Sequence, residues 1–109
     1  MRKDILDTLN HTIELEEKFL PKFEAGTSQH SLLKNRIQSL YTARKLISRE
    51  AVPTKEELKF ALPRIESIIR KMSKARDKYD PDNRNYKRFD PTVQIMEEVR
   101  IAILETLHK

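Results

Sequence analysis

The segment from residue 54 to residue 79 constrains the fold of this chain more than any other. Its apolar residues recur at intervals of three and four, which is the spacing of one face of an α-helix. They are Leu58, Ala61, Leu62, Ile65, Ile68, Ile69, Met72, Ala75 and Tyr79. Just before them, Thr54 and Glu57 have the spacing of a capping box, in which each side chain accepts a backbone N–H at the helix start. The segment predicts a helix over residues 55–79 with one buried face.

Three further segments repeat this periodicity and predict helices at about residues 5–24, 31–49 and 91–108. The expected buried stripes are Ile5, Leu9, Ile13, Leu20 and Phe23; Leu33, Ile37, Leu40, Ala43 and Ile47; and Val93, Met96, Val99, Ile103 and Leu107. The expected N-terminal caps are Asp4, Ser28 or Ser31, and Asp90 with Pro91 at the first helical position. Gly26 is expected to adopt a left-handed conformation at the end of the first helix.

Length and composition favour one domain, residues 1–109, built from these helices alone. The chain has one glycine and no tryptophan, whereas β-sandwiches and barrels need many turn glycines. Short connections between amphipathic helices favour antiparallel neighbours. The predicted fold is therefore all-α, an antiparallel up-down four-helix bundle that reads as two helical hairpins, 4–49 and 54–108.

Four charged residues fall on predicted buried faces, where apolar residues are expected. They are Glu16, Arg36, Arg44 and Arg100. A lone buried charge costs several kcal/mol, so each needs a partner or access to water. Because the first two helices form one hairpin, we expect Glu16 to pair with Arg36 or Arg44. The alternative is an open polar cleft in which the three arginines bind an anion, since guanidinium groups hold carboxylate or phosphate bidentately.

The last predicted helix has a wider apolar face than a simple bundle needs. Ile101 and Leu104 broaden it beyond the buried stripe. Exposed apolar surface of this kind is typical of protein–protein contacts. The two residues are therefore a candidate interface with another protein or with a second copy of the chain as a homodimer.

The net charge of +5 is unevenly distributed. Residues 27–49 carry cations and no acid, and residues 70–88 carry many cations among three aspartates and two tyrosines, with Phe89 directly after them. This pattern makes nucleic-acid binding a second hypothesis, because cations bind phosphates and rings stack on bases. The candidate contacts are Lys74, Arg76, Lys78, Arg84, Lys87 and Arg88. Neither a helix-turn-helix spacing nor an RNA-binding aromatic motif accompanies them.

Nothing in the chain predicts an enzyme, a metal site or a cofactor. There is no cysteine, and no pair of histidines has metal-ligand spacing. Glu105 and His108 match half of a di-iron motif, but no second copy exists. The acidic residues that follow the N-terminus do not fit a signal peptide, and no apolar run is long enough to span a membrane, so we expect a cytoplasmic protein.

Two resemblances accompany these features. His30-Ser-Leu-Leu-Lys-Asn-Arg-Ile37 with Leu40, and Ala61-Leu-Pro-Arg-Ile-Glu-Ser-Ile-Ile69 with Lys71, resemble small uncharacterised helical proteins of Gram-positive bacteria over about residues 26–75. That likeness implies a small helical fold and no particular activity. In size, basic charge and expected architecture the chain also resembles bacteriocin immunity proteins, which implies a role inside a producing cell.

Overall fold

The structure is a computed structural model that describes residues 2–109, and within this range all regular structure is helical. The elements are α1 (Arg2–Phe19), a short 3-10 helix η1 (Leu20–Lys22), α2 (Ser28–Ser48), α3 (Lys55–Arg76) and α4 (Arg84–Leu107). The predicted all-α class with four main helices is confirmed. The largest difference from the predicted ranges lies at the start of α4.

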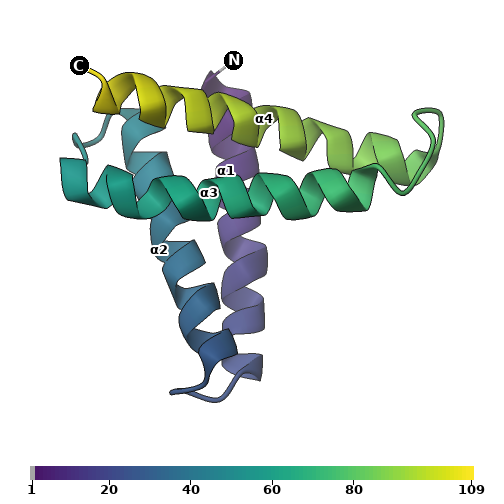
Figure 1. Cartoon of the computed structure of the whole chain (residues 1–109), viewed down its shortest axis with the longest axis horizontal. Coiled ribbons are helices and arrows are strands. Elements are labelled where there is room, and N and C mark those ends of the chain that lie inside the picture. The colour runs from purple at the N-terminus through teal and green to yellow at the C-terminus, as the bar shows by residue number, and fades with distance from the viewer. Residues whose placement is uncertain (1) are drawn as a thin grey trace.

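The four helices pair as the two predicted hairpins, α1–α2 and α3–α4, within a compact bundle. Figure 1 shows the α3–α4 hairpin lying across the upper half of the α1–α2 hairpin, whose lower half projects beyond it. The molecule measures 40 × 36 × 21 Å. Its shortest dimension accommodates about two helices of 10 Å diameter, so the bundle consists of two crossed layers with one hairpin in each.

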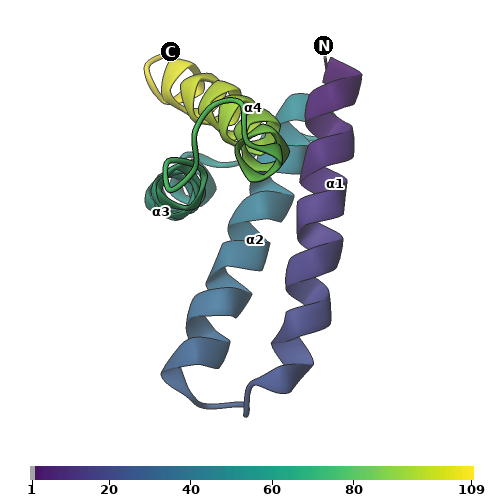
Figure 2. The same ribbon diagram turned by 90° about the vertical axis from the view of Figure 1, so that its right-hand side faces the viewer.

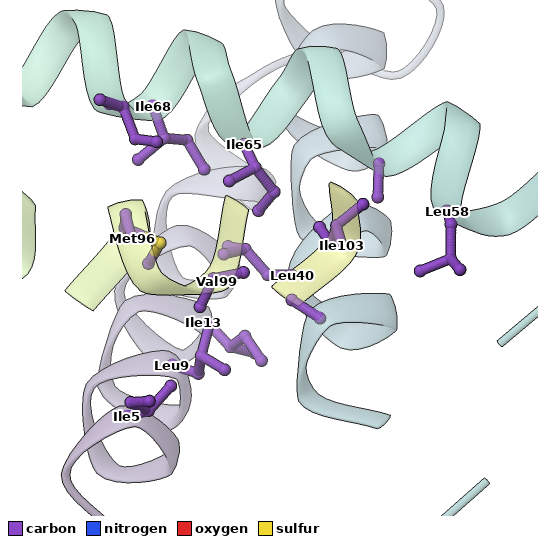
Figure 3. Close-up of a cluster of buried hydrophobic side chains, with 13 residues drawn as sticks. Ile5, Leu9, Ile13, Leu40, Leu58, Ile65, Ile68, Met96, Val99 and Ile103 are labelled. Carbon is purple, nitrogen blue, oxygen red and sulfur yellow. The ribbon is translucent and has the colours of Figure 1, made fainter. Parts of the chain in front are cut away.

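The core lies where the hairpins cross, and every main helix contributes to it (Figure 3). Leu9, Leu40, Ile65, Met96 and Ile103 are completely buried there. Every buried Ala, Val, Ile, Leu and Met in the described part of the chain belongs to a predicted stripe. The periodicity of the sequence therefore identified the inward face of each helix correctly.

The start of α3 has the predicted capping box. The Thr54 hydroxyl accepts the Glu57 N–H at 3.0 Å, and the Glu57 carboxylate accepts the Thr54 N–H at 2.8 Å. The other carboxylate oxygen of Glu57 lies 3.3 Å from the Lys45 ammonium at the end of α2. These contacts lower the pKa of Glu57, chiefly through the backbone hydrogen bond from Thr54. One side chain therefore joins the two hairpins at their connection.

The predicted ends of the first helix are wrong. α1 begins at Arg2, so Asp4 lies in its first turn instead of capping it. α1 ends at Phe19, several residues before the predicted end, and continues as η1 around Pro21. Proline cannot donate a backbone hydrogen bond and its ring crowds the preceding turn, which favours this tighter and shorter ending.

The turn between α1 and α2 also differs from the prediction. Gly26 is left-handed as expected, with φ of 92°, but it lies beyond η1 and does not end a helix. The N-cap of α2 is Thr27, whose hydroxyl accepts the His30 N–H at 3.2 Å. Neither Ser28 nor Ser31 is therefore the cap, because Thr27 already accepts the hydrogen bond from the His30 N–H.

The predicted start of the last helix at Asp90-Pro91 is wrong. α4 begins after Asn83, whose side chain accepts the Asn85 N–H at 2.8 Å. The Asp90 carboxylate instead binds Arg76 at 2.8 Å, so it is not available as a cap. Pro91 lies inside the helix on its exposed side, where water can serve the carbonyl that lacks a donor.

Three large residues expected in the core neither belong to it nor pack against it. Phe23 is 38% exposed and Tyr79 is 37% exposed, while Leu20 is only partly buried. Phe23 and Tyr79 follow the ends of their helices, so the helical register that placed them on the buried face no longer applies. All three belong to the hairpin ends that lie farthest from the crossing.

Candidate functional site

The lower half of the α1–α2 hairpin is not covered by the second hairpin, as Figure 2 shows from the side. Four large apolar side chains are exposed there: Leu15 at 43%, Phe19 at 49%, Phe23 at 38% and Leu32 at 68%. We call these four residues the tip patch. They make up most of the large exposed apolar residues of the described chain, and the others lie at scattered positions.

The tip patch lines two neighbouring hollows that lie between the projecting hairpin and the α3–α4 layer. One, of about 290 Å³, has Phe19, Phe23 and Leu32 in its wall and is bordered by Lys71 of α3. The other, of about 400 Å³, has Leu15 and Phe19 facing α3 and α4 residues. Glu16 and Phe19 line both hollows, so the two are adjacent, and we call them together the corner groove.

The α3 and α4 side of the corner groove combines apolar and basic residues. Ile68, Met72 and Phe89 extend the apolar surface of the tip patch onto the second hairpin. Lys71 and Arg88 lie at the edges, and neither has an acidic partner within the described residues. The groove is therefore an apolar surface with free positive charges at its border.

The predicted pair of Glu16 with an arginine lies inside this groove. An oxygen of Glu16 is 3.5 Å from a guanidinium nitrogen of Arg36, and about one fifth of each side chain is exposed. Glu16 is the one carboxylate among the described residues that line the groove. Since Arg36 already neutralises it, the groove presents a net positive charge to a ligand.

The other two inward arginines are held elsewhere, so the three arginines do not form the predicted anion cleft. Arg44 donates to Asn10 at 3.1 Å and lies over the Tyr41 ring, 4.6 Å from its centre. Arg100 lies 3.5 Å from Glu97 of its own helix and 3.9 Å from Glu66 of α3. Each arginine therefore binds a neighbour across or along its own hairpin.

Tyr41, whose ring lies under Arg44, also connects α2 to α1. The Tyr41 hydroxyl donates to the Glu17 carboxylate at 2.8 Å. This hydrogen bond raises the pKa of Tyr41, because loss of its proton would leave two negative charges in contact. The groups with shifted pKa, Tyr41, Glu57 and Arg76, thus take part in helix caps and contacts between elements.

The basic segment at the far end of α3–α4 is less uniform than its sequence suggests. Arg76 binds Asp77 at 2.9 Å as well as Asp90, and these hydrogen bonds raise its pKa. The remaining predicted nucleic-acid contacts are exposed: Lys74, Lys78, Arg84, Lys87 and Arg88. Of these, Arg88 borders the corner groove, while Arg76 is held by two carboxylates, so the six cations are not equally available to a ligand.

The predicted interface residues of α4 lie outside the core. Ile101 is 47% exposed and Leu104 is partly buried. They provide a smaller apolar surface than the four side chains of the tip patch. The predicted interface is therefore the smaller of the two apolar surfaces, and the tip patch was not predicted.

A signal for the tip patch was present in the sequence. Leu15 and Phe19 are four residues apart and lie beside the stripe of Ile5, Leu9 and Ile13, which makes a second apolar row on α1. Leu32 likewise lies next to a stripe residue, Leu33. These additional apolar positions widen the apolar surface at one end of the hairpin only.

No group of three or more acidic or histidine side chains in the described residues is arranged to hold a metal ion. None of the described helices is long and apolar enough to cross a membrane. Comparison with protein-family models, with curated proteins and with solved structures returns no match for this chain. The surface itself is therefore the basis for a functional proposal.

Proposed function

We propose that the protein is a non-catalytic, cytoplasmic interaction module that binds another protein through the corner groove. The observation that carries this proposal is the clustering of Leu15, Phe19, Phe23 and Leu32 at one uncovered end of the molecule. Single exposed apolar residues are common on soluble proteins, whereas contiguous groups of large ones mark contact surfaces. Aromatic side chains that lie in or beside a hollow are frequent anchors in such contacts.

Site-specific photo-cross-linking in the native cells tests this proposal. A photoreactive amino acid replaces exposed Gln29, which lines the corner groove without belonging to the tip patch. A second chain carries it at exposed Glu105, on the helix that holds Ile101 and Leu104. We expect a defined adduct with another protein from position 29, identified by mass spectrometry.

The chain offers a matched pair of control variants for this experiment. Phe19→Asp and Ile101→Asp alter side chains that are almost equally exposed, 49% and 47%, so both should fold. The adduct from position 29 should disappear in Phe19→Asp and persist in Ile101→Asp. Adducts that form only from position 105, or an adduct with a second copy of the chain that Ile101→Asp removes, would place the interface on α4 and refute the proposal.

Nucleic-acid binding is the second candidate, favoured by the exposed cations Lys74, Lys78, Arg84 and Lys87. It has less support because Arg76 of this segment is bound to two aspartates, and Arg36 and Lys45 of α2 are also paired. Binding to duplex and single strands, titrated with salt, tests it directly. Phosphate contacts should weaken steeply as salt rises, and an absence of binding at low salt would exclude this candidate.

A further inference from the structure

We infer that the partner presents an amphipathic α-helix with acidic residues beside its apolar face, and that this helix lies in the corner groove. This inference rests on the proposed function and specifies the chemistry of its partner. It follows from three properties of the groove: the backbone groups around it, its apolar surface and the charges at its edge.

The backbone around the groove excludes pairing with an extended peptide. Apart from Phe23 in the turn after η1, the walls are formed by α1, α2, α3 and α4, whose central amides and carbonyls are used within the helices. Addition of a strand needs an exposed sheet edge, and residues 2–109 contain no strand. A helix satisfies its own backbone and can dock through side chains alone, as in other complexes between a helix and a groove.

The shape of the groove also suits a helix. Residues of both hairpins line the hollows. The two hairpins cross, and the α1–α2 hairpin extends past α3 (Figures 1 and 2). A helix placed there contacts the tip patch on one side and residues such as Met72 and Phe89 on the other. The apolar residues of the partner helix therefore need to recur every three or four positions, so that they form one continuous face.

Charge complementarity specifies the flanks of that helix. Lys71 and Arg88 border the groove with no acidic partner in the described structure, and Lys22 lies over the Phe19 ring, 4.8 Å from its centre. Glutamate or aspartate beside the apolar face of the partner can pair with these cations, whereas lysine is repelled. The same charges disfavour a second copy at this site, because a symmetric contact would bring the two basic edges together.

A display library of helical peptides, each about 18 residues long so that the helix is stable, provides the probe. Leucine occupies one face in every member, and the two flanking rows are free to be Glu, Gln or Lys. Peptides that bind are enriched from the library in three separate selections. The targets are the wild-type chain, Phe19→Asp and the double variant Lys71→Glu/Arg88→Glu. Fluorescence anisotropy then gives the Kd of the enriched peptide and of its Glu→Lys counterpart.

We expect glutamate to be enriched in the flanking rows and the acidic peptide to bind about fivefold tighter than its lysine counterpart, as two partly exposed ion pairs allow. Phe19→Asp should abolish enrichment, and the double variant should reverse the preference. Enrichment of lysine, equal Kd values for the two peptides or no enriched helix would each overturn the inference.

The two proposals fail in distinguishable ways. If position 29 yields a partner that depends on Phe19 while the library shows no acidic preference, the acidic helix is wrong and protein binding at the groove is retained. If neither the adduct nor an enriched peptide depends on Phe19, both proposals are refuted. Circular dichroism of each variant confirms that the helices are intact in every case.

Discussion

The two hairpins end differently at the points farthest from their crossing. The α3–α4 hairpin closes with a polar turn, in which Arg76 binds Asp77 and Asp90 and Asn83 caps the following helix. The α1–α2 hairpin closes with a turn that exposes Phe23 beside the other apolar residues of the tip patch. The first end is stabilised by its own ion pairs and exposes one large apolar residue, Tyr79, whereas the second exposes the four residues of the tip patch.

This difference separates apolar residues that stabilise the fold from those that do not. In α2, Leu40 faces the crossing and is completely buried, while Leu32, about two turns away, is 68% exposed. Both residues are leucines in one helix, so their difference comes from what covers them.

Leu40→Ala should lower the free energy of unfolding by about 3 kcal/mol, because it removes buried methylene and methyl groups and leaves a cavity. Leu32→Ala in the same helix should change it by no more than about 0.5 kcal/mol, since the side chain is already in water. Urea unfolding followed by circular dichroism measures both values. A comparable loss for the two variants would mean that the tip patch belongs to the core, which would remove the basis of the proposed function.

The sequence predicts the core side of this comparison and misses the exposed side for a physical reason. Periodicity reports which face of a helix is apolar, and it identified Leu40, Ile65 and Met96 correctly. It cannot report how much of that face the other hairpin covers, because coverage depends on the crossing of the hairpins. Phe23 was predicted to be buried because it continues the apolar spacing of α1, although that helix ends at Phe19.

A helix-start signal in the sequence predicts the structure when all of its contacts lie within one helical turn. The capping box of Thr54 and Glu57 depends on residues three positions apart, so its geometry is set within one turn. The Asp90-Pro91 signal failed because Arg76, fourteen residues earlier, binds the aspartate. The partner of Glu16 also depends on a contact between distant residues. Its place on a buried face predicted an arginine partner, and the structure distinguished Arg36 from Arg44.

Arg76→Ala tests the polar end of the comparison. It removes two hydrogen-bonded ion pairs at 2.8 and 2.9 Å, and with them the link between the end of α3 and the first turns of α4. We expect a lower urea midpoint and faster amide hydrogen exchange in residues 84–90. Lys78→Ala, which removes an exposed cation without a partner in the described structure, is the matched control and should leave both quantities unchanged. Equal behaviour of the two variants would show that this turn does not depend on its ion pairs.

Glu16→Ala tests the boundary between the covered and uncovered parts of the α1–α2 hairpin. Its single contact with Arg36 is 3.5 Å long and partly exposed, so the loss of unfolding free energy should be about 1 kcal/mol, less than for a fully buried pair. Exposed Glu14→Ala, two positions earlier in α1, is the control for helix propensity and net charge. A loss of about 3 kcal/mol or more would mean that Arg36 is left without access to water, and the corner groove would then be less open than its exposed side chains indicate.

The connection between the hairpins should give the smallest effect, and pH reveals it. The folded pKa of Glu57 is lowered, first by the Thr54 N–H and then by Lys45. Its ionised form therefore contributes stability that is fully present above the unfolded pKa of about 4.3 and is lost as the pH falls through the lower folded value. Glu57→Gln keeps an acceptor for the capping box but cannot ionise.

In a series of urea midpoints from pH 7 to pH 2.5, Glu57→Gln should be less stable than the wild type at neutral pH and should approach it below about pH 4. Glu56→Gln changes a neighbouring glutamate that makes no ion pair among the described residues, so it should keep the wild-type dependence on pH. A constant difference between Glu57→Gln and the wild type across the series would show that this carboxylate does not couple the two hairpins through its charge. The crossing would then depend on apolar packing alone, and the distinction between covered and uncovered apolar side chains would account for the whole architecture.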